Sequence, residues 1–146
     1  LQSVDTFVTV AEITAYSALD DGLKPGDKGF NVKFCGGKPV IDYTIACDPQ
    51  YWSLQFGLPW KEKWSQRPLS KEDQEEAALA PVFWELIFIV EDQYGKLHVR
   101  IPRDVGGRIK HNRLDEYKGY DETARSEAKK FGKQYRKVYV MRKDRE

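Results

Sequence analysis

The feature that most constrains the fold is the run from Val82 to Val90, which is apolar at nearly every position. A strand that is apolar on both faces belongs in the centre of a sheet. The turn residues 92–95 follow it, and Leu97 to Ile101 supply a second apolar segment. We therefore predict a central hairpin. The expected pairs are Val90–Leu97, Phe88–Val99 and Leu86–Ile101, with His98 and Arg100 sharing the other face with Ile87 and Ile89.

An alternating pattern predicts another hairpin between residues 29 and 47. Apolar and polar residues alternate over 29–35 and again over 40–47, and Gly36-Gly37-Lys38-Pro39 between them is typical of a turn. One register makes every facing pair agree in character, so the pattern favours it strongly. Its apolar pairs are Phe34–Ile41, Val32–Tyr43 and Phe30–Ile45, and its polar pairs are Lys33–Asp42 and Asn31–Thr44.

The two cysteines bear on the compartment. In the predicted hairpin Cys35 and Cys47 would lie roughly 20 Å apart, on opposite faces, whereas a disulfide needs Cα atoms within about 7 Å. We therefore expect two reduced thiols, Cys47 as a core residue, and an intracellular reducing compartment, either the cytoplasm or the interior of an organelle. Because the chain begins at Leu1 and not at methionine, a cleaved transit peptide is one interpretation and a boundary made by trimming or cloning is another.

The remaining segments complete an α+β prediction. A long strand is expected from Asp5 to Ala18, a short acidic helix after the Ser70 cap, and a last strand over 138–141. A basic helix is expected over residues 122–133 after an Asp121 cap, with a narrow buried stripe formed by Ala124, Ala128, Phe131 and Tyr135. At 146 residues the chain has the length of one domain. We therefore predict a single α+β domain over residues 1–146. It would be an antiparallel sheet or partly open β-barrel built from two hairpins, with a short acidic helix and a C-terminal basic helix.

Charge and motifs exclude several functions. The net charge is +1, but residues 1–102 carry −5 and residues 103–146 carry +6, so the second part can attract acidic partners. The two histidines lie in separate elements, and no nucleophile elbow, phosphate-binding loop or dinucleotide fingerprint is present. No apolar run approaches the roughly 20 residues of a membrane helix. The sequence therefore predicts no transmembrane segment, no catalytic residue, no metal and no cofactor, and it disfavours an enzyme.

Residues 49–69 are unusually aromatic and contain three of the four tryptophans. Such a segment either packs over its own sheet or docks on a partner, because rigid aromatic side chains serve as anchors at interfaces. The interface candidates are Tyr51, Trp52, Phe56, Trp60 and Trp64.

A basic loop follows the central hairpin. Gly106 and Gly107 allow backbone amides to approach an anion, and the neighbouring side chains are positive. The loop is either a site for an anion or acidic partner, or simply a mobile surface loop. The candidates are Arg108, Lys110, His111 and Arg113.

These features rank three functions. The leading prediction is a non-enzymatic interaction protein, an accessory or structural subunit of a larger protein assembly, docking through residues 50–64 and 103–146. The alternative is a small β-barrel-like protein that binds nucleic acid on aromatic and basic residues. A further alternative is a small-ligand binder or an enzyme with an unrecognised pocket, which would use His98, Asp42 or Glu85.

Overall fold

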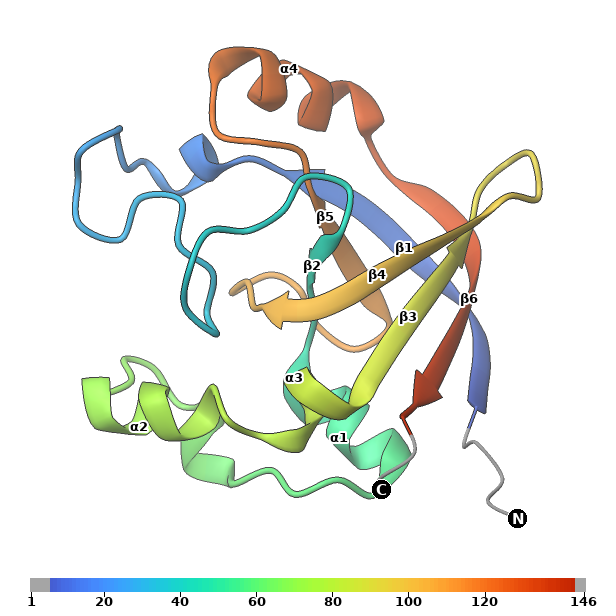
Figure 1. Cartoon of the computed structure of the whole chain (residues 1–146), viewed down its shortest axis with the longest axis horizontal. Helices are drawn as coiled ribbons and strands as arrows, with labels where there is room; N and C mark the ends of the chain where they lie inside the picture. The colour runs from blue at the N-terminus through green and yellow to red at the C-terminus, as the bar shows by residue number, and fades with distance from the viewer. Residues whose placement is uncertain (1–5, 144–146) are drawn as a thin grey trace.

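The computed structural model describes residues 6–143, which form six strands and several short helices in a mixed α+β arrangement (Figure 1). The strands are β1 (Thr6–Tyr16), β2 (Thr44–Ala46), β3 (Leu86–Glu91), β4 (Leu97–Asp104), β5 (Arg113–Tyr117) and β6 (Gln134–Arg142). The α-helices are α1 (Pro49–Phe56), α2 (Lys71–Ala77), α3 (Pro81–Glu85) and α4 (Glu122–Phe131). Two 3₁₀ turns, η1 (Ala18–Asp21) and η2 (Glu62–Ser65), complete the elements.

The strands pair in a closed ring in the order β1-β5-β2-β4-β3-β6, and β6 returns to β1. The α+β class is confirmed, and the barrel-like closure agrees with the second of the two predicted forms. The expectation that the sheet is antiparallel and built from two hairpins is wrong. The β1–β5 and β2–β4 pairings are parallel, and parallel neighbours need a long connection rather than a hairpin. The ring is thinnest at β2, where only two residue pairs join it to β5.

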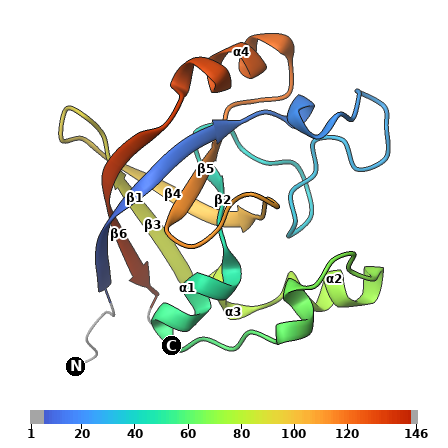
Figure 2. The ribbon, with the colours of Figure 1, turned by 180° about the vertical axis from the view of Figure 1, so that it is seen from behind.

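The helices lie at the two ends of the ring. Figures 1 and 2 show α4 at one end and α1, α2 and α3 together at the other. Trp52 of α1 is fully buried and meets Phe88 of β3 edge to face, with ring centroids 5.1 Å apart. The helical end of the ring is therefore closed by aromatic packing. None of the helices within residues 6–143 is both long enough and apolar enough to span a membrane.

The central hairpin is confirmed, but its register differs by one residue from the prediction. Phe88 pairs with Arg100 and Val90 pairs with His98. The Asp92 side chain accepts hydrogen bonds from the amides of Tyr94 and Lys96, and this tight turn sets the register. As a result His98 and Arg100 lie on the inner face of the ring, while the apolar Leu97 and Val99 are exposed. Residues 82–85, predicted as strand, belong to α3.

The predicted hairpin over residues 29–47 is wrong, apart from the short strand β2. Asn31 and Asp42 have positive φ angles of 56°, a conformation that interrupts an extended strand. Two backbone donors of this segment bond to other strands: the amide of Cys35 bonds to the carbonyl of Arg103, and the amide of Asp42 bonds to that of Tyr117. Other donors close tight turns within the segment, as the amide of Lys33 does on the carbonyl of Gly37. Turns and bonds to β4 and β5 have replaced the predicted hairpin.

The predicted separation of the cysteines is wrong for the same reason. The amide of Cys35 bonds to the carbonyl of Arg103, and the amide of Cys47 bonds to that of the next residue, Asp104, each at 3.1 Å. Both cysteines are free thiols, and both lie beside one short stretch of β4. The argument from distance to a reducing compartment therefore does not hold.

Both predicted helix caps are confirmed. The Ser70 side chain accepts from the amide of Asp73, and the Asp121 side chain accepts from the amide of Ala124. Ala124 and Ala128 of α4 are buried as the pattern predicted. Tyr135, expected on the same helical stripe, instead lies in β6 and is exposed.

The packing of the core predicts a large loss of stability on truncation of Phe88. This side chain is fully buried inside the ring, so Phe88→Ala removes its contacts and leaves a cavity. We expect a loss of about 3–5 kcal/mol in the free energy of unfolding, measured by urea denaturation. Leu54→Ala is the control, because Leu54 is 77% exposed. Equal losses in the two variants would contradict the described core.

Candidate functional site

A row of polar side chains crosses the outer face of four neighbouring strands. Thr14 of β1 pairs with Asp115 of β5, Asp115 pairs with Ala46 of β2, and Ala46 pairs with Asp104 of β4. Residues paired across a sheet point to the same face. With neighbouring strands about 4.8 Å apart, the Cα atoms of the two aspartates lie roughly 10 Å apart. Ala46, which is buried, lies between the two aspartates in this row.

Each aspartate of this row has defined hydrogen-bond donors. The Tyr16 hydroxyl donates to Asp104 Oδ2 at 2.8 Å. The amides of Phe34 and Val105 donate to the other oxygen, Oδ1, at 2.8 and 3.0 Å. The Thr14 hydroxyl donates to Asp115 Oδ1 at 2.8 Å. The two carboxylates are thus held in place by separate groups, without a hydrogen bond between them.

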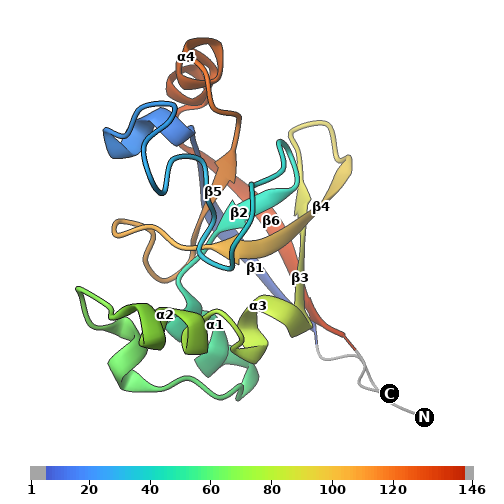
Figure 3. The same ribbon diagram turned by 60° about the vertical axis from the view of Figure 1, so that its left-hand side comes forward.

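The long connection between β1 and β2 lies against this site. Figure 3 shows its loops beside β2, β4 and β5. The Tyr117 hydroxyl donates to the side-chain oxygen of Asn31, and the Tyr16 and Tyr117 rings lie 5.5 Å apart. Ser17 begins η1 with a reciprocal capping box to Asp20. The connection thereby covers part of the site and brings two more acids, Asp20 and Asp21, close to the row.

Burial sets the protonation of the acids. Burial is the largest cause that raises the pKa of Asp115 from 3.8 to about 6, and the charges of Asp20 and Asp104 add to it, against the Thr14 hydrogen bond and Arg113. Burial also raises the pKa of Asp104, although its hydrogen bonds from Tyr16, Phe34 and Val105 oppose the shift. The pKa of Asp21 is raised by burial and by Asp20.

Tyr16 acts as a hydrogen-bond donor in this site. Burial and then the neighbouring Asp104 carboxylate raise the pKa of its hydroxyl far above the usual value. Tyr16 therefore stays protonated throughout the neutral pH range, and its hydroxyl donates a hydrogen bond to Asp104. A donated hydrogen bond favours the ionised form of the acceptor, so Asp104 is the better-stabilised carboxylate of the pair.

The cysteines beside the site are poor nucleophiles. Burial raises the pKa of the Cys35 thiol to about 12 and raises that of Cys47 well above its usual value. Thiolate is the reactive form, so neither residue is activated. This agrees with the expectation that Cys47 is a core residue. Within residues 6–143 no three His, Cys, Asp or Glu side chains are arranged to hold a metal ion.

The predicted aromatic candidates are mostly part of the core. Trp52 and Trp64 are buried, and Tyr51, Phe56 and Trp60 are half-buried. Trp60 stacks edge to face on Trp64, with ring centroids 5.1 Å apart. Trp52 and Trp64 therefore pack within their own protein, whereas an interface role of the three half-buried residues stays a prediction.

The basic candidates divide between two environments. Arg108, Lys110 and His111 are exposed, whereas Arg113 forms an ion pair with Glu12. The His111 amide donates to Asp48, the residue that caps α1.

The structure brings parts of the two predicted sets together. A small pocket of about 190 Å³ is lined by Trp60 and Trp64 on one side and by Lys110 and His111 on the other. The sequence analysis predicted the aromatic and the basic segments as separate sites.

The sequence prediction missed Asp104, Asp115 and Tyr16. One signal was present: Asp115 lies between the apolar residues Leu114 and Tyr117, and an aspartate inside a strand goes against its β propensity. The pairing of two distant aspartates with Ala46 has no local signal, because it depends on a parallel crossover.

Comparisons with known proteins show a shared fold. No family model matches the chain, and no curated protein matches it in sequence. The Streptomyces papain inhibitor matches with a TM-score of 0.50 and 12% identity, over 92% of this chain and 94% of the inhibitor. The Escherichia coli lytic transglycosylase MltA matches in one apo form with a TM-score of 0.49 and 16% identity, over 84% of this chain and 30% of MltA. LtgG, a lytic transglycosylase of Burkholderia pseudomallei, matches with a TM-score of 0.43 and 16% identity, over 84% and 29%.

These likenesses limit and correct the predicted function. This chain spans about 28% of the first matching structure, a form of MltA, and at such identities the likeness shows the fold alone. The matching structures named above are lytic transglycosylases and a papain inhibitor, and none of them is an accessory subunit. The docking segment of residues 50–64 is largely packed inward. The prediction of a non-enzymatic accessory subunit is therefore wrong.

The raised pKa of Asp115 predicts a change in stability with pH. Its pKa rises from 3.8 to about 6 on folding, so the stability that it contributes is complete below about pH 4 and is lost as the pH rises through about 6. Asp115→Asn keeps the acceptor oxygen for Thr14 and removes the charge. We expect the variant to gain about 1–3 kcal/mol over the wild-type protein at pH 8 and little at pH 4, by urea denaturation. A gain that is independent of pH would contradict the assignment.

Proposed function

We propose that the chain is an acid–base enzyme. It cleaves the glycosidic bond of a substrate that lies between the carboxyl groups of Asp115 and Asp104. The single observation that carries this proposal is the placement of the two carboxyl groups on either side of Ala46, both with raised pKa values. A pair of carboxyl groups flanking the scissile bond is the usual machinery of glycoside cleavage. One acts as a proton donor and the other as a carboxylate.

The separation of the pair supports this chemistry over peptide cleavage by two aspartates. In an aspartic protease the two carboxyls share a proton at about 3 Å. Here a whole strand lies between them, and each carboxylate has its own donors. Glycoside-cleaving pairs stand about 5–9.5 Å apart, with the substrate between them.

The two aspartates take different roles. Asp115, with a pKa of about 6, is partly protonated near neutral pH and donates its proton to the leaving oxygen as the C–O bond breaks. Asp104, which accepts hydrogen bonds from Tyr16 and two amides, is the carboxylate that stabilises the developing positive charge at the sugar. The attacking hydroxyl then gives its proton to the Asp115 carboxylate, so that the acid is restored.

The attacking hydroxyl distinguishes two reaction types. If it belongs to water, the products together gain the mass of one water. If it belongs to the substrate itself, as in a transglycosylase, they gain none. MltA and LtgG are lytic transglycosylases, so both reaction types are included in the assay and are separated by mass spectrometry of the products.

The test of the proposal is cleavage of a panel of polysaccharides, including bacterial cell-wall glycan, by the purified protein. We expect Asp115→Asn and Asp104→Asn each to lower the rate by about 10²–10⁴-fold. The matched control is Glu122→Gln on α4, because that carboxylate is 80% exposed and lies outside the site. Cleavage that survives in both aspartate variants, or no cleavage of any glycan by the wild-type protein, would overturn the proposal.

The pH dependence of the rate gives a separate check. A general acid must be protonated, so the rate of the wild-type protein should fall as the pH rises through about 6, the pKa of Asp115. Rates measured from pH 4 to pH 8 on one active substrate test this. A rate that rises across this range would contradict the role of Asp115 as the acid.

A further inference from the structure

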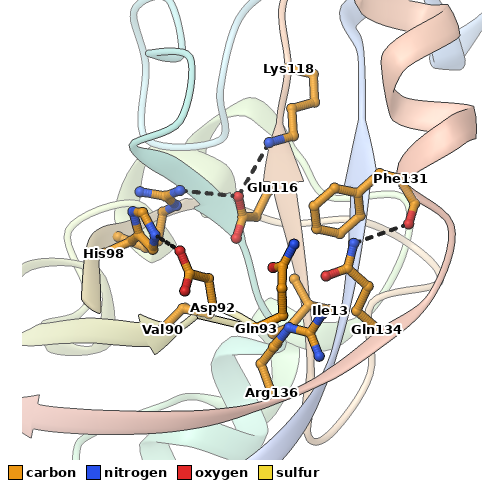
Figure 4. A pocket seen from close by; sticks show the side chains of 11 residues that line it. Ile13, Val90, Asp92, Gln93, His98, Glu116, Lys118, Phe131, Gln134 and Arg136 are labelled. Atoms are coloured by element: carbon orange, nitrogen blue, oxygen red, sulfur yellow. Dashed lines mark hydrogen bonds and ion pairs between the residues drawn. The ribbon is translucent and has the colours of Figure 1, made fainter. Parts of the chain in front are cut away.

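A second pocket lies inside the ring of strands, at the end that carries α4. Its volume is about 290 Å³, and inward-facing residues of β1, β3, β4, β5 and β6 line it together with the β3–β4 turn. Figure 4 shows Glu116 pointing into it, whereas the adjacent Asp115 lies on the other face of β5. The pocket therefore shares a strand with the proposed catalytic site but opens on the opposite face.

Charged groups occupy positions where a small barrel normally places apolar side chains. Arg100 is 8% exposed and Glu116 is 5% exposed, and Arg100 Nη2 lies 3.3 Å from Glu116 Oε1. Lys118 Nζ lies 3.5 Å from the same oxygen and 2.8 Å from Asp42 Oδ1. A buried ion pair is seldom more stabilising than apolar residues of the same volume, so stability alone does not account for these residues.

One donor in this network has no partner. Arg100 Nε is buried and makes no hydrogen bond, although Nη1 bonds to the carbonyl of Val99 and Nη2 reaches Glu116. Buried donors are nearly always paired, and an unpaired one calls for an explanation. Arg100 lines the pocket, but its Nε has almost no accessible surface. An acceptor bound in the pocket would complete the hydrogen bonding of Nε once the guanidinium turns toward it.

The pocket also carries an excess of positive charge. Asp92 pairs with His98 at 2.7 Å, and Glu116 is shared by Arg100 and Lys118. Arg136 lines the same pocket, and among residues 6–143 no carboxylate lies in ion-pair range of it. Its Nη1 donates to the carbonyl of Tyr135 at 3.1 Å, and its other guanidinium N–H groups are available to an anion from solution.

An apolar surface lies beside these cations. Ile13 and Val90 line the pocket from β1 and β3, and Phe131 lines it from the end of α4. Figure 4 shows the Phe131 ring on the side of the pocket near Gln134. A ligand site that combines apolar walls with a few convergent polar groups is typical of small-molecule recognition.

We propose that this pocket binds a small organic acid. Arg100 Nε and the Arg136 guanidinium hold its carboxylate, and its apolar body lies on Ile13, Val90 and Phe131. This site is separate from Asp104 and Asp115, and it does not depend on the proposed glycosidic activity.

The test uses benzoate as the probe, in isothermal titration calorimetry with the full chain. We expect wild-type protein to bind benzoate, and Arg136→Gln to weaken binding by about ten-fold or more, the effect of losing a charged hydrogen bond. Lys137→Gln is the matched control, because it removes the same charge from the next, exposed position of β6. Arg100→Lys is a second variant, since it keeps the charge facing Glu116 but removes the unpaired Nε; it should also weaken binding.

Two further probes separate the parts of the proposal. Benzamide has the ring without the charge, and inorganic phosphate has charge without the ring, so both should bind at least ten-fold more weakly than benzoate. Asp115→Asn should bind benzoate as the wild-type protein does, even where it has lost glycan cleavage. The proposal is overturned if wild-type protein fails to bind benzoate at millimolar concentration, if Arg136→Gln binds it as tightly, or if phosphate binds equally well.

Discussion

The structure depends on the pairing of the three-residue strand β2. Its backbone pairs with β4 in parallel and with β5 in antiparallel fashion, and without these bonds the ring of strands would be open on one side. The inward side chain, Ile45, is fully buried in the core. The outward side chain, Ala46, sets the gap between Asp104 and Asp115. One short strand thus contributes to both the core and the proposed catalytic site, because alternate residues of a strand face opposite sides.

Local patterns predicted those elements that local interactions determine. The strand β1, the β3–β4 hairpin and the caps at Ser70 and Asp121 follow from alternation, turn residues and side-chain capping. The hairpin register differed by one residue, because the two bonds to the Asp92 side chain tighten the turn beyond what composition indicates. The segment at 29–43 alternates like a strand, yet it folds into turns, and two of its amides bond to β4 and β5. No pattern within the segment reveals those distant acceptors.

The same distinction explains why the candidate site was missed. The tryptophans between residues 52 and 64 were conspicuous in the sequence, but conspicuous aromatics are as useful to a core as to an interface, and only burial separates the two. Asp104 and Asp115 are ordinary residues in the sequence. They become notable when two strands place them on either side of Ala46 and burial shifts their pKa values. Acid–base chemistry of this kind is a property of the fold, visible after folding.

Strand β5 carries both proposed sites on two consecutive residues, with Asp115 on the outer face and Glu116 on the inner face. The two carboxylates belong to separate compartments divided by the backbone of a single strand. A change in one site therefore affects the other site by displacing the backbone of β5, which pairs with β1 on one side and with β2 on the other. The backbone of β5 thus separates the two proposed sites as well as holding their residues in place. Substitutions on one face can alter one site while the other keeps its geometry.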